Sequence, residues 1–417
     1  MSSNKNLREV SLKILTNVLL KEKKLKDEFD YFSNQIDKKN VNFLKNLVYG
    51  VLRFKESIDE KIKEYYKKSF DKLNENSKNI LRIALYQIDI MDSIPNYASV
   101  NTAVEIAKCE SVVFSKVVNA ILMNFIRNSD KLDFSKHNHS EKIINEWKKE
   151  YSNQQIKDLC NWNNSIPKIW FRSNDKFLNT VKLDNKNKFQ HHSEITNYIT
   201  FDNSKLAIEK YVKKKLLIVQ SPSSSLVCKI LDVKENDTVI DGCASPGGKA
   251  RCIFENINNS NVFHINDINP KKYLQLKKDF MDIASSISCK DASVEKFPMA
   301  DKILLDVPCS ATGTIQKNPD IKWKNQDLKK LNILQLKILK NMSKFLKVNG
   351  AIVYSTCSLN KSENLKVIDM FLKENKNFLL DDASKFIDKK YVKNKCLSIF
   401  PPKHDLEGMF AARLIKS

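Results

Sequence analysis

Two cysteines in the C-terminal half of the chain each follow an apolar run that predicts a buried strand. Cys309 lies in LLDVPCSATG, residues 304–313, and Cys357 lies in YSTCS, residues 354–358. A free cysteine is often only a buried apolar residue, but two of them beside small polar residues at neighbouring strand ends favour a chemical role. A thiolate is a nucleophile that supports covalent catalysis. On chemical grounds alone, both thiols remain candidates for the attacking group.

A glycine-rich turn follows a third predicted strand. It consists of DGCASPGGKA, residues 241–250, and leads into a predicted helix. The chain has only 7 glycines, and four of them lie in this turn and in LLDVPCSATG. Glycine lets the backbone pass close to a ligand, although the GxxxxGK[ST] pattern of triphosphate-binding loops and the GxGxxG pattern are both absent. Asp267, about twenty residues further on, ends the next predicted strand, where a carboxylate can accept from ribose hydroxyls. The predicted ligand is therefore a molecule that contains a nucleoside.

Short apolar runs alternate with helical stretches from about residue 216 onward. The predicted helices include residues 270–284 and 328–346. The predicted strands are 237–241, 261–265, one before Asp291, 302–306, 351–355 and a last edge strand in GMFAARLIKS. This alternation predicts an α/β domain with a parallel sheet and right-handed crossovers. Because ligands bind outside the carboxyl ends of such strands, one edge of the sheet is expected to carry the glycine-rich turn, Asp267, Asp291, Asp306 and both cysteines.

The rest of the chain divides by composition. Residues 1–130 are predicted to form an all-α bundle, because apolar residues recur at helical spacing without an alternating strand pattern. Residues 131–215 are predicted to be a linker with one or two helices followed by a small mixed connecting region, and residues 216–417 to be the α/β domain. His137 and His139 flank an asparagine, a weak likeness to a nuclease motif. Without a carboxylate cluster nearby, they are predicted to lie in a solvated linker.

The charge of the chain favours a polyanionic partner. The 417 residues include 71 Lys and Arg against 49 Asp and Glu, a formal net charge of +22. Such an excess suits nucleic acid before membrane, although a lysine-rich genome would also raise the isoelectric point. No apolar run approaches the roughly 20 residues of a membrane span, and the first residues lack the apolar core of a signal peptide. Nine cysteines without a CxxC pair argue against a disulfide framework and against structural zinc. A cytoplasmic protein with free thiols and no metal is expected.

The motifs together resemble those of a known enzyme family. DGCASPGGKA, LLDVPCSATGTIQKNPDIKW and YSTCS resemble the motif set of S-adenosylmethionine-dependent RNA cytosine-5 methyltransferases, in particular the bacterial 16S ribosomal RNA enzymes of the Sun/Fmu type. Residues 80–108 and 117–127 resemble the NusB-like RNA-binding domain of these enzymes, and residues 170–174 and 219–225 are similar to their connecting region. Departures are small: Ser245 and Ala250 replace the Ala and Thr of the usual CAAPGGKT loop, and Asn266 stands where an apolar residue is usual.

The resemblance implies a multi-domain protein with an all-α NusB-like bundle, a small mixed region and a Rossmann-like α/β methyltransferase domain. It implies methyl transfer from S-adenosylmethionine to C5 of one cytosine in 16S rRNA through a covalent adduct between a cysteine and C6. In relatives with both cysteine motifs the TCS thiol attacks and the PCS thiol assists release. Cys357 is therefore expected to be the nucleophile, with Cys309 assisting release. The residues expected to hold the cofactor are Cys243, Ala244, Ser245, Pro246, Gly247, Gly248, Lys249, Asp267, Asp291 and Asp306.

Some of these residues are also expected to contact the RNA. Asp306 is expected to orient either the cytosine amino edge or the cofactor, and Lys249 to steady the cofactor or the base electrostatically. The target base must be extruded into the site. Trp323, among Lys317, Lys322 and Lys324, is predicted to stack on the RNA and hold it.

Two alternatives remain. The same chemistry on tRNA is one, although the NusB-like region favours rRNA by analogy of fold. The other is a non-catalytic, antitermination-like RNA-binding protein with a degenerate methyltransferase domain, and the intact cysteine and glycine motifs argue against it. A monomer is expected.

Overall fold

The computed structural model describes residues 6–66, 68–173, 188–214, 216–255, 257 and 261–417. The chain forms two compact units. The helical unit comprises Met1–Ile166 and Ile315–Asn325, and the sheet unit comprises Pro167–Thr314 and Gln326–Ser417. The predicted division into three domains at residues 130 and 215 stays a prediction. Residue 174, the last of the stretch that resembles the connecting region, lies outside the described residues.

In the helical unit, every regular element among the described residues is a helix, as predicted. Polar side chains begin several of them: Asn6, Asn74 and Ser111 each accept a backbone N–H of the first turn. Leucine, isoleucine and valine side chains from successive helices share one buried core. The α-helices of this unit are α1 (Leu7–Leu19), α2 (Leu25–Ser33), α3 (Val41–Arg53), α4 (Lys55–Tyr65), α5 (Glu75–Ile90), α6 (Asn96–Glu110), α7 (Val112–Arg127), α8 (Glu141–Lys148) and α9 (Asn153–Asn164).

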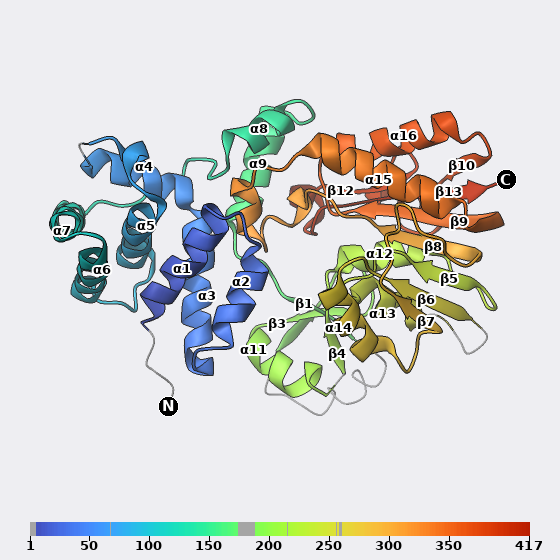
Figure 1. Cartoon of the computed structure of the whole chain (residues 1–417), viewed down its shortest axis with the longest axis horizontal. Helices are drawn as coiled ribbons and strands as arrows, with labels where there is room; N and C mark the ends of the chain where they lie inside the picture. Colours follow the sequence, from blue (N-terminus) through green and yellow to red (C-terminus); the bar gives the residue numbers. More distant parts are fainter. Residues whose placement is uncertain (1–5, 67, 174–187, 215, 256, 258–260) are drawn as a thin grey trace. The chain divides into compact units, whose positions relative to one another are not determined.

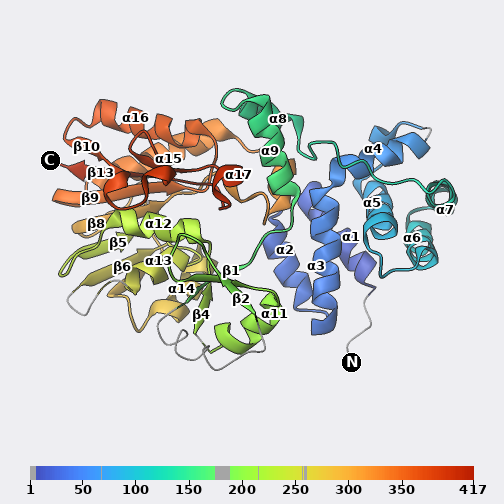
Figure 2. The same ribbon diagram turned by 180° about the vertical axis from the view of Figure 1, so that it is seen from behind.

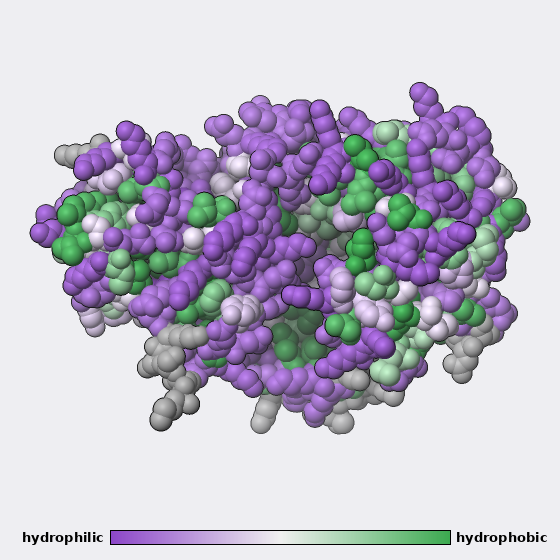
Figure 3. Space-filling model, viewed as in Figure 1, coloured by the Kyte–Doolittle hydropathy of each residue, from purple (hydrophilic) through white to green (hydrophobic). Residues whose placement is uncertain are grey.

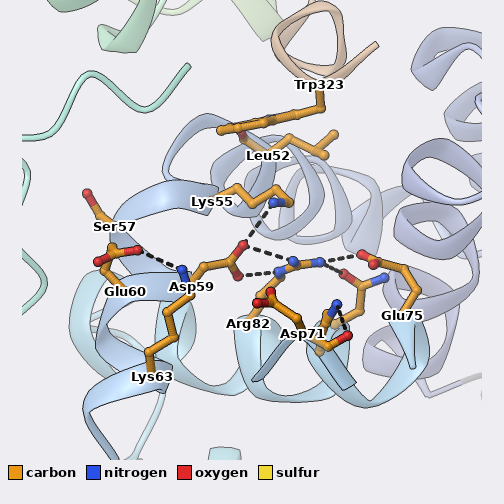
Figure 4. A network of polar contacts seen from close by, with 12 residues as sticks. Leu52, Lys55, Ser57, Asp59, Glu60, Lys63, Asp71, Glu75, Arg82 and Trp323 are labelled. Carbon is orange, nitrogen blue, oxygen red and sulfur yellow. Dashed lines mark hydrogen bonds and ion pairs between the residues drawn. The ribbon is translucent and has the colours of Figure 1, made fainter. Parts of the chain in front are cut away.

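A buried ion-pair network joins α4 and α5 of the helical unit (Figure 4). The Arg82 guanidinium donates to the two carboxylate oxygens of Asp59 at 2.6 and 2.9 Å, and it also pairs with Glu75. Lys55 Nζ donates to the same Asp59 carboxylate at 2.8 Å. Arg82 is 2% exposed, so these acids are what makes its burial tolerable. Lys55 of this network also makes a cation–π contact with the ring of Trp323.

The sheet unit begins with a small antiparallel sheet in the order β2-β3-β1-β4. Its strands are β1 (Trp170–Ser173), β2 (Phe189–His191), β3 (Tyr198–Phe201) and β4 (Leu217–Val219). A short helix α11 (Ser204–Ala207) and a π-helix (Ile208–Val212) connect β3 to β4. Phe171, Ile199 and Leu217 fill a separate small core beneath them.

The large sheet of this unit has the order β11-β12-β13-β9-β8-β5-β6-β7, with β10 paired to β13. The pairs among β5, β6, β7, β8 and β9 are parallel, as predicted. The strands are β5 (Thr238–Asp241), β6 (Val262–Asn266), β7 (Ser286–Ser288), β8 (Ala300–Asp306), β9 (Leu346–Thr356), β10 (Phe378–Asp381), β11 (Val392–Lys393), β12 (Cys396–Ile399) and β13 (Met409–Lys416).

Helices cover both faces of this sheet (Figures 1 and 2). Alternate strand residues point to opposite faces: Leu304 packs with one group of helices, and Ile303 and Leu305 pack with the other. Strands buried on both faces are continuous apolar runs, which is why the sequence revealed them. The first group is α12 (Pro222–Leu231), α13 (Gly248–Phe254) and α14 (Pro270–Phe280), and the second is α15 (Leu328–Ser343) and α16 (Leu365–Glu374). A short helix α17 (Pro401–His404) precedes the last strand.

One strand prediction was wrong. The C-terminal stretch was expected at the edge of the sheet, but β13 lies inside it, antiparallel to β9 on one side and paired with β12 on the other. Residues 409–414 are all buried, which an edge position does not require. A short apolar strand carries no mark of its neighbours in its own sequence.

The surface is mostly hydrophilic on the face shown in Figure 3, with apolar residues scattered among polar ones. Within the described ranges, no helix is both long and apolar enough to span a bilayer. The described residues also contain no group of three or more His, Cys, Asp and Glu that could hold a metal ion.

Candidate active site

Three parallel strands bring their carboxyl ends to one edge of the large sheet. Asp241 at the end of β5 lies beside Leu304 of β8, and Asp306 at the end of β8 lies beside Ser355 of β9. The loops that leave these ends are the glycine-rich turn, the PCS loop (residues 308–310) and the TCS loop (residues 356–358). The structure therefore places all three predicted motifs at the same edge.

The two predicted cysteines lie in contact. The Sγ atoms of Cys309 and Cys357 are 3.4 Å apart, and both side chains are half-buried. The hydrogen bond with Cys357, burial, and the negative charges of Cys357, Glu363 and Asp306 together raise the pKa of the Cys309 thiol well above its ordinary range. These surroundings therefore favour the protonated form of the Cys309 thiol.

Backbone contacts hold the two cysteine loops together. Gly313 N–H donates to the carbonyl of Cys357 at 2.9 Å, and Leu359 N–H donates to Thr312 Oγ1 at 2.9 Å. A Cβ added to Gly313 would meet the carbonyl oxygen of Gly408 at 2.6 Å, so only glycine allows this approach. The low glycine content of the chain made this position conspicuous in the sequence.

Lys249 and Asp306 form an ion pair beside the thiols. Lys249 Nζ lies 2.6 Å from Asp306 Oδ2, and Ser355 Oγ donates to the other oxygen of Asp306 at 3.0 Å. Burial lowers the pKa of Lys249, but the charges of Asp306 and Cys357 and the hydrogen bond with Asp306 outweigh it and raise the pKa. Lys249 is therefore a cation within electrostatic reach of Cys357.

Asp241 is a residue that the sequence analysis quoted but gave no role. It is fully buried, and its two oxygens complete no hydrogen bond with the described residues, although the nearby backbone N–H of Cys243 favours its charged form. Burial and the charge of Asp306 raise its pKa from the ordinary 3.8 to about 7. A buried carboxyl group without a partner at the end of a central strand indicates that a ligand supplies the partner.

The glycine-rich turn is shaped by its contacts with the end of β6. Gly247 has φ 98°, and a Cβ there would meet Phe280 Cε2 at 2.8 Å, so glycine is required. Asp267 accepts the backbone N–H of Ser245 at 3.2 Å and of Asn269 at 2.9 Å. Its carboxylate is therefore oriented by the loop and retains lone pairs for a ligand.

Asn266, noted in the sequence as a departure from the usual apolar residue, is buried and structural. Its amide donates to the carbonyls of Gly242 and Lys290, both at 3.0 Å, and so joins the ends of β5, β6 and β7. Asp291 lies in the turn after β7, where it accepts the backbone N–H of Ser293 at 2.8 Å. The unusual residue thus fixes the edge that carries the predicted cofactor residues.

Glu363 was missed altogether by the sequence analysis. Its side chain is fully buried and accepts hydrogen bonds from Ser310, which follows Cys309, and from Ser358, which follows Cys357. A Glu in the polar stretch KSENLK gives no sign of burial. Its spacing of six residues from the TCS cysteine was the only available signal.

The remaining thiols lie apart from this arrangement. Cys243 lies in the glycine-rich turn, where burial and the nearby carboxylates of Asp241 and Asp306 raise its pKa well above the ordinary range. Cys252 is buried in α13, and Cys289 is exposed. None of these three shares the contact that joins Cys309 to Cys357.

The predicted RNA contact of Lys322 was wrong, whereas the stacking of Trp323 on RNA stays a prediction. Lys322 is fully buried in the helical unit and donates to the carbonyl of Arg53 at 3.0 Å. The Trp323 indole N–H donates to the carbonyl of Leu52 at 2.8 Å, and Lys55 Nζ lies 4.6 Å from the centroid of its ring (Figure 4). Lys322 and Trp323 thus bind the helical unit itself, because residues 315–325 belong to it.

One of the two histidines also differs from the prediction. His139 is buried, not solvated: its ring lies 5.4 Å from that of Trp147, and its Nε2 is 3.1 Å from the Asn163 amide. Burial and the charge of Lys322 lower its pKa well below the ordinary value. It is a neutral packing residue, and His137 is exposed beside it.

Two family models match different parts of the chain. Residues 228–415 match the family model of the 16S rRNA methyltransferase RsmB/F, and residues 5–127 match that of the NusB family. The chain combines a NusB-family domain with an RsmB/F-family methyltransferase domain. The family and the fold class predicted from the motifs are confirmed.

Curated relatives match along nearly the whole chain. The probable ribosomal RNA small subunit methyltransferase B of Bacillus subtilis (strain 168) is 29% identical over 414 residues, which are 92% of each chain. The ribosomal RNA small subunit methyltransferase B of Pectobacterium carotovorum subsp. carotovorum (strain PC1) is 26% identical over 440 residues, with 100% of both chains covered.

Solved structures share the fold. The crystal structure of PH0851 covers 100% of both chains with a TM-score of 0.78 and 21% identity. NSun6 from Pyrococcus horikoshii covers 66% of this chain and 98% of its own, with a TM-score of 0.57 and 18% identity. At these identities the likeness shows the fold of the methyltransferase domain, and the chemistry rests on the site.

Proposed function

We propose that this methyltransferase transfers a methyl group from S-adenosylmethionine to C5 of a cytosine in 16S rRNA, through a covalent adduct between Cys357 and C6 of the base. The observation that carries the proposal is the contact of two half-buried thiols, 3.4 Å apart, at the sheet edge that also holds Lys249 and Asp306. The names of the curated relatives support small-subunit rRNA as the substrate.

The residues around the glycine-rich turn fit the cofactor. Gly247 gives the turn the left-handed backbone that packs it against Phe280, Asp267 has lone pairs for ribose hydroxyls, and the buried Asp241 oxygens complete no hydrogen bond with the described residues. The turn from Cys243 to Lys249, with Asp267 and Asp291, would hold the nucleoside and the amino acid. When bound, S-adenosylmethionine supplies an electrophilic methyl group.

Cytosine C5 is a weak nucleophile, and the protein has to activate it. Addition of the Cys357 thiolate to C6 makes C5 enamine-like, so that C5 can accept the methyl group. A base must then remove the C5 proton, and the bond between Cys357 and C6 must break to restore the ring. The contact between Cys309 and Cys357 Sγ supports a role for Cys309 in that release.

Lys249 and Asp306 organise the two reactants. The Lys249 cation stabilises the Cys357 thiolate before attack. Asp306 can accept from the amino group of the cytosine, since its carboxylate lies next to the cation and is 29% exposed. The predictions that the protein is monomeric and cytoplasmic stay predictions.

The test is to map 5-methylcytosine in RNA from cells with and without this protein. Bisulfite sequencing should show one cytosine of 16S rRNA that loses methylation in the deletion strain and regains it with the wild-type gene, but not with a Cys357→Ala gene. Loss of the mark from a tRNA instead would favour the tRNA substrate. Unchanged 5-methylcytosine in both RNAs would overturn the proposal.

A further inference from the structure

We propose that Glu363 is a positioning residue for both cysteines: its buried carboxylate holds the groups that directly follow Cys309 and Cys357, and so fixes the two thiols against each other. The inference rests on the proposed function for its catalytic meaning. Its structural basis is independent of the substrate.

The Glu363 carboxylate is saturated with hydrogen bonds. Oε1 accepts the backbone N–H of Ser310 at 2.8 Å and the Gln335 amide at 3.1 Å. Oε2 accepts from Ser358 Oγ at 2.5 Å, from Asn360 Nδ2 at 3.0 Å and from Ser310 Oγ. One side chain thus joins the PCS loop, the TCS loop and α15.

The backbone of Glu363 is itself fixed to the sheet. Tyr354 of β9 donates its hydroxyl to the Glu363 carbonyl at 2.6 Å, and the tyrosine is fully buried. The two serines that Glu363 binds also contact each other, with Ser310 Oγ and Ser358 Oγ 2.9 Å apart. Because each serine is the residue directly after a cysteine and is bonded to it by a peptide bond, displacement of the carboxylate would move both thiols.

The negative charge of Glu363 also affects the ionisation of Cys309. All five of its hydrogen-bond contacts are with neutral groups, so the negative charge is not cancelled by a cation within this set. It is among the charges that raise the pKa of Cys309, while the Lys249 cation lies within electrostatic reach of Cys357. Glu363 therefore disfavours ionisation of Cys309.

The experiment compares Glu363→Gln, which keeps the shape but not the charge, with Glu363→Asp, which keeps the charge. The matched control is Asp301→Asn, because Asp301 accepts the Thr238 N–H at 2.9 Å at the opposite end of the sheet. The first readout is the alkylation rate of Cys309 and Cys357 by iodoacetamide in the full-length protein without RNA, mapped by mass spectrometry. The second is kcat and KM for methyl transfer to 16S rRNA.

Glu363→Gln should raise the alkylation rate of Cys309 relative to Cys357, because removal of the Glu363 charge favours the Cys309 thiolate. It should lower kcat by about a hundredfold with little change in KM, the effect of misplaced reacting groups. Glu363→Asp should keep the wild-type alkylation ratio, and Asp301→Asn should leave both readouts unchanged. If Glu363→Gln does not fold, Ser358→Ala removes one contact of the carboxylate and should lower kcat in the same way.

An unchanged alkylation ratio and an unchanged kcat in Glu363→Gln, with only a lower melting temperature, would overturn the inference and leave Glu363 as a packing residue. Because alkylation is measured without RNA, it decides the role of Glu363 even if the wild-type protein methylates no rRNA. The two proposals can therefore fail separately.

Discussion

Replacing Asp241 with asparagine should change how the stability of the chain depends on pH. In the folded chain the pKa of Asp241 is raised to about 7 by burial and by the charge of Asp306, whereas its ordinary value is 3.8. The folded state therefore binds the proton more tightly than the unfolded state, so this group makes stability fall as pH rises from about 4 to about 7. A difference of roughly 3 pKa units at 1.36 kcal/mol each corresponds to about 4 kcal/mol, of which about 3 kcal/mol is lost above pH 5.

Scanning calorimetry from pH 5 to pH 8 measures this effect. Since 1 kcal/mol changes the melting temperature of a unit of this size by about 2–4 °C, Asp241→Asn should gain about 6–12 °C relative to wild type across that range. Asp301→Asn is the control of opposite sign. Burial raises the pKa of Asp301, but hydrogen bonds from Lys347 and the Thr238 N–H outweigh this and lower it, so the variant should lose stability at neutral pH. A pH-independent difference between Asp241→Asn and wild type would refute the reasoning.

Two further predictions concern the turn and the tryptophan. Gly247→Ala should weaken binding of S-adenosylhomocysteine by at least about tenfold in titration calorimetry, because a left-handed residue with a side chain costs ~1–2 kcal/mol and its Cβ would clash with Phe280. Equal affinities for Gly247→Ala and wild type would contradict the account. Trp323→Ala should lower the melting temperature of the helical unit by an amount equivalent to ~2 kcal/mol or more. Reduced RNA affinity at an unchanged melting temperature would instead support the original stacking prediction.

The sequence was sufficient for the large sheet and for the meeting of the two cysteines. Both follow from one rule, because buried parallel strands are continuous apolar runs and their carboxyl ends share an edge. The meeting of Cys309 and Cys357 could therefore be predicted without knowledge of distant contacts.

Lys322 and Glu363 were misjudged because their burial depends on distant contacts. Lys322 and Trp323 form an aromatic and basic pattern typical of RNA binding, but their partners Arg53 and Leu52 are about 270 positions away in the sequence. Glu363 is charged and surrounded by polar residues, so its burial follows only from the meeting of the two serines. Local patterns show which residues can do chemistry, and tertiary contacts decide which of them are available for it.

The central claim is that Cys357 attacks the base and Cys309 assists release, and trapping of the adduct tests it most directly. Each cysteine variant is incubated with 16S rRNA and S-adenosylmethionine and examined by denaturing electrophoresis for a protein band shifted by bound RNA. Cys309→Ala should accumulate this band, because attack and methyl transfer proceed while release is slow. Cys357→Ala should form none, and Cys289→Ala, which removes an exposed thiol, should resemble wild type. A shifted band from Cys357→Ala with none from Cys309→Ala would contradict the account and make Cys309 the nucleophile.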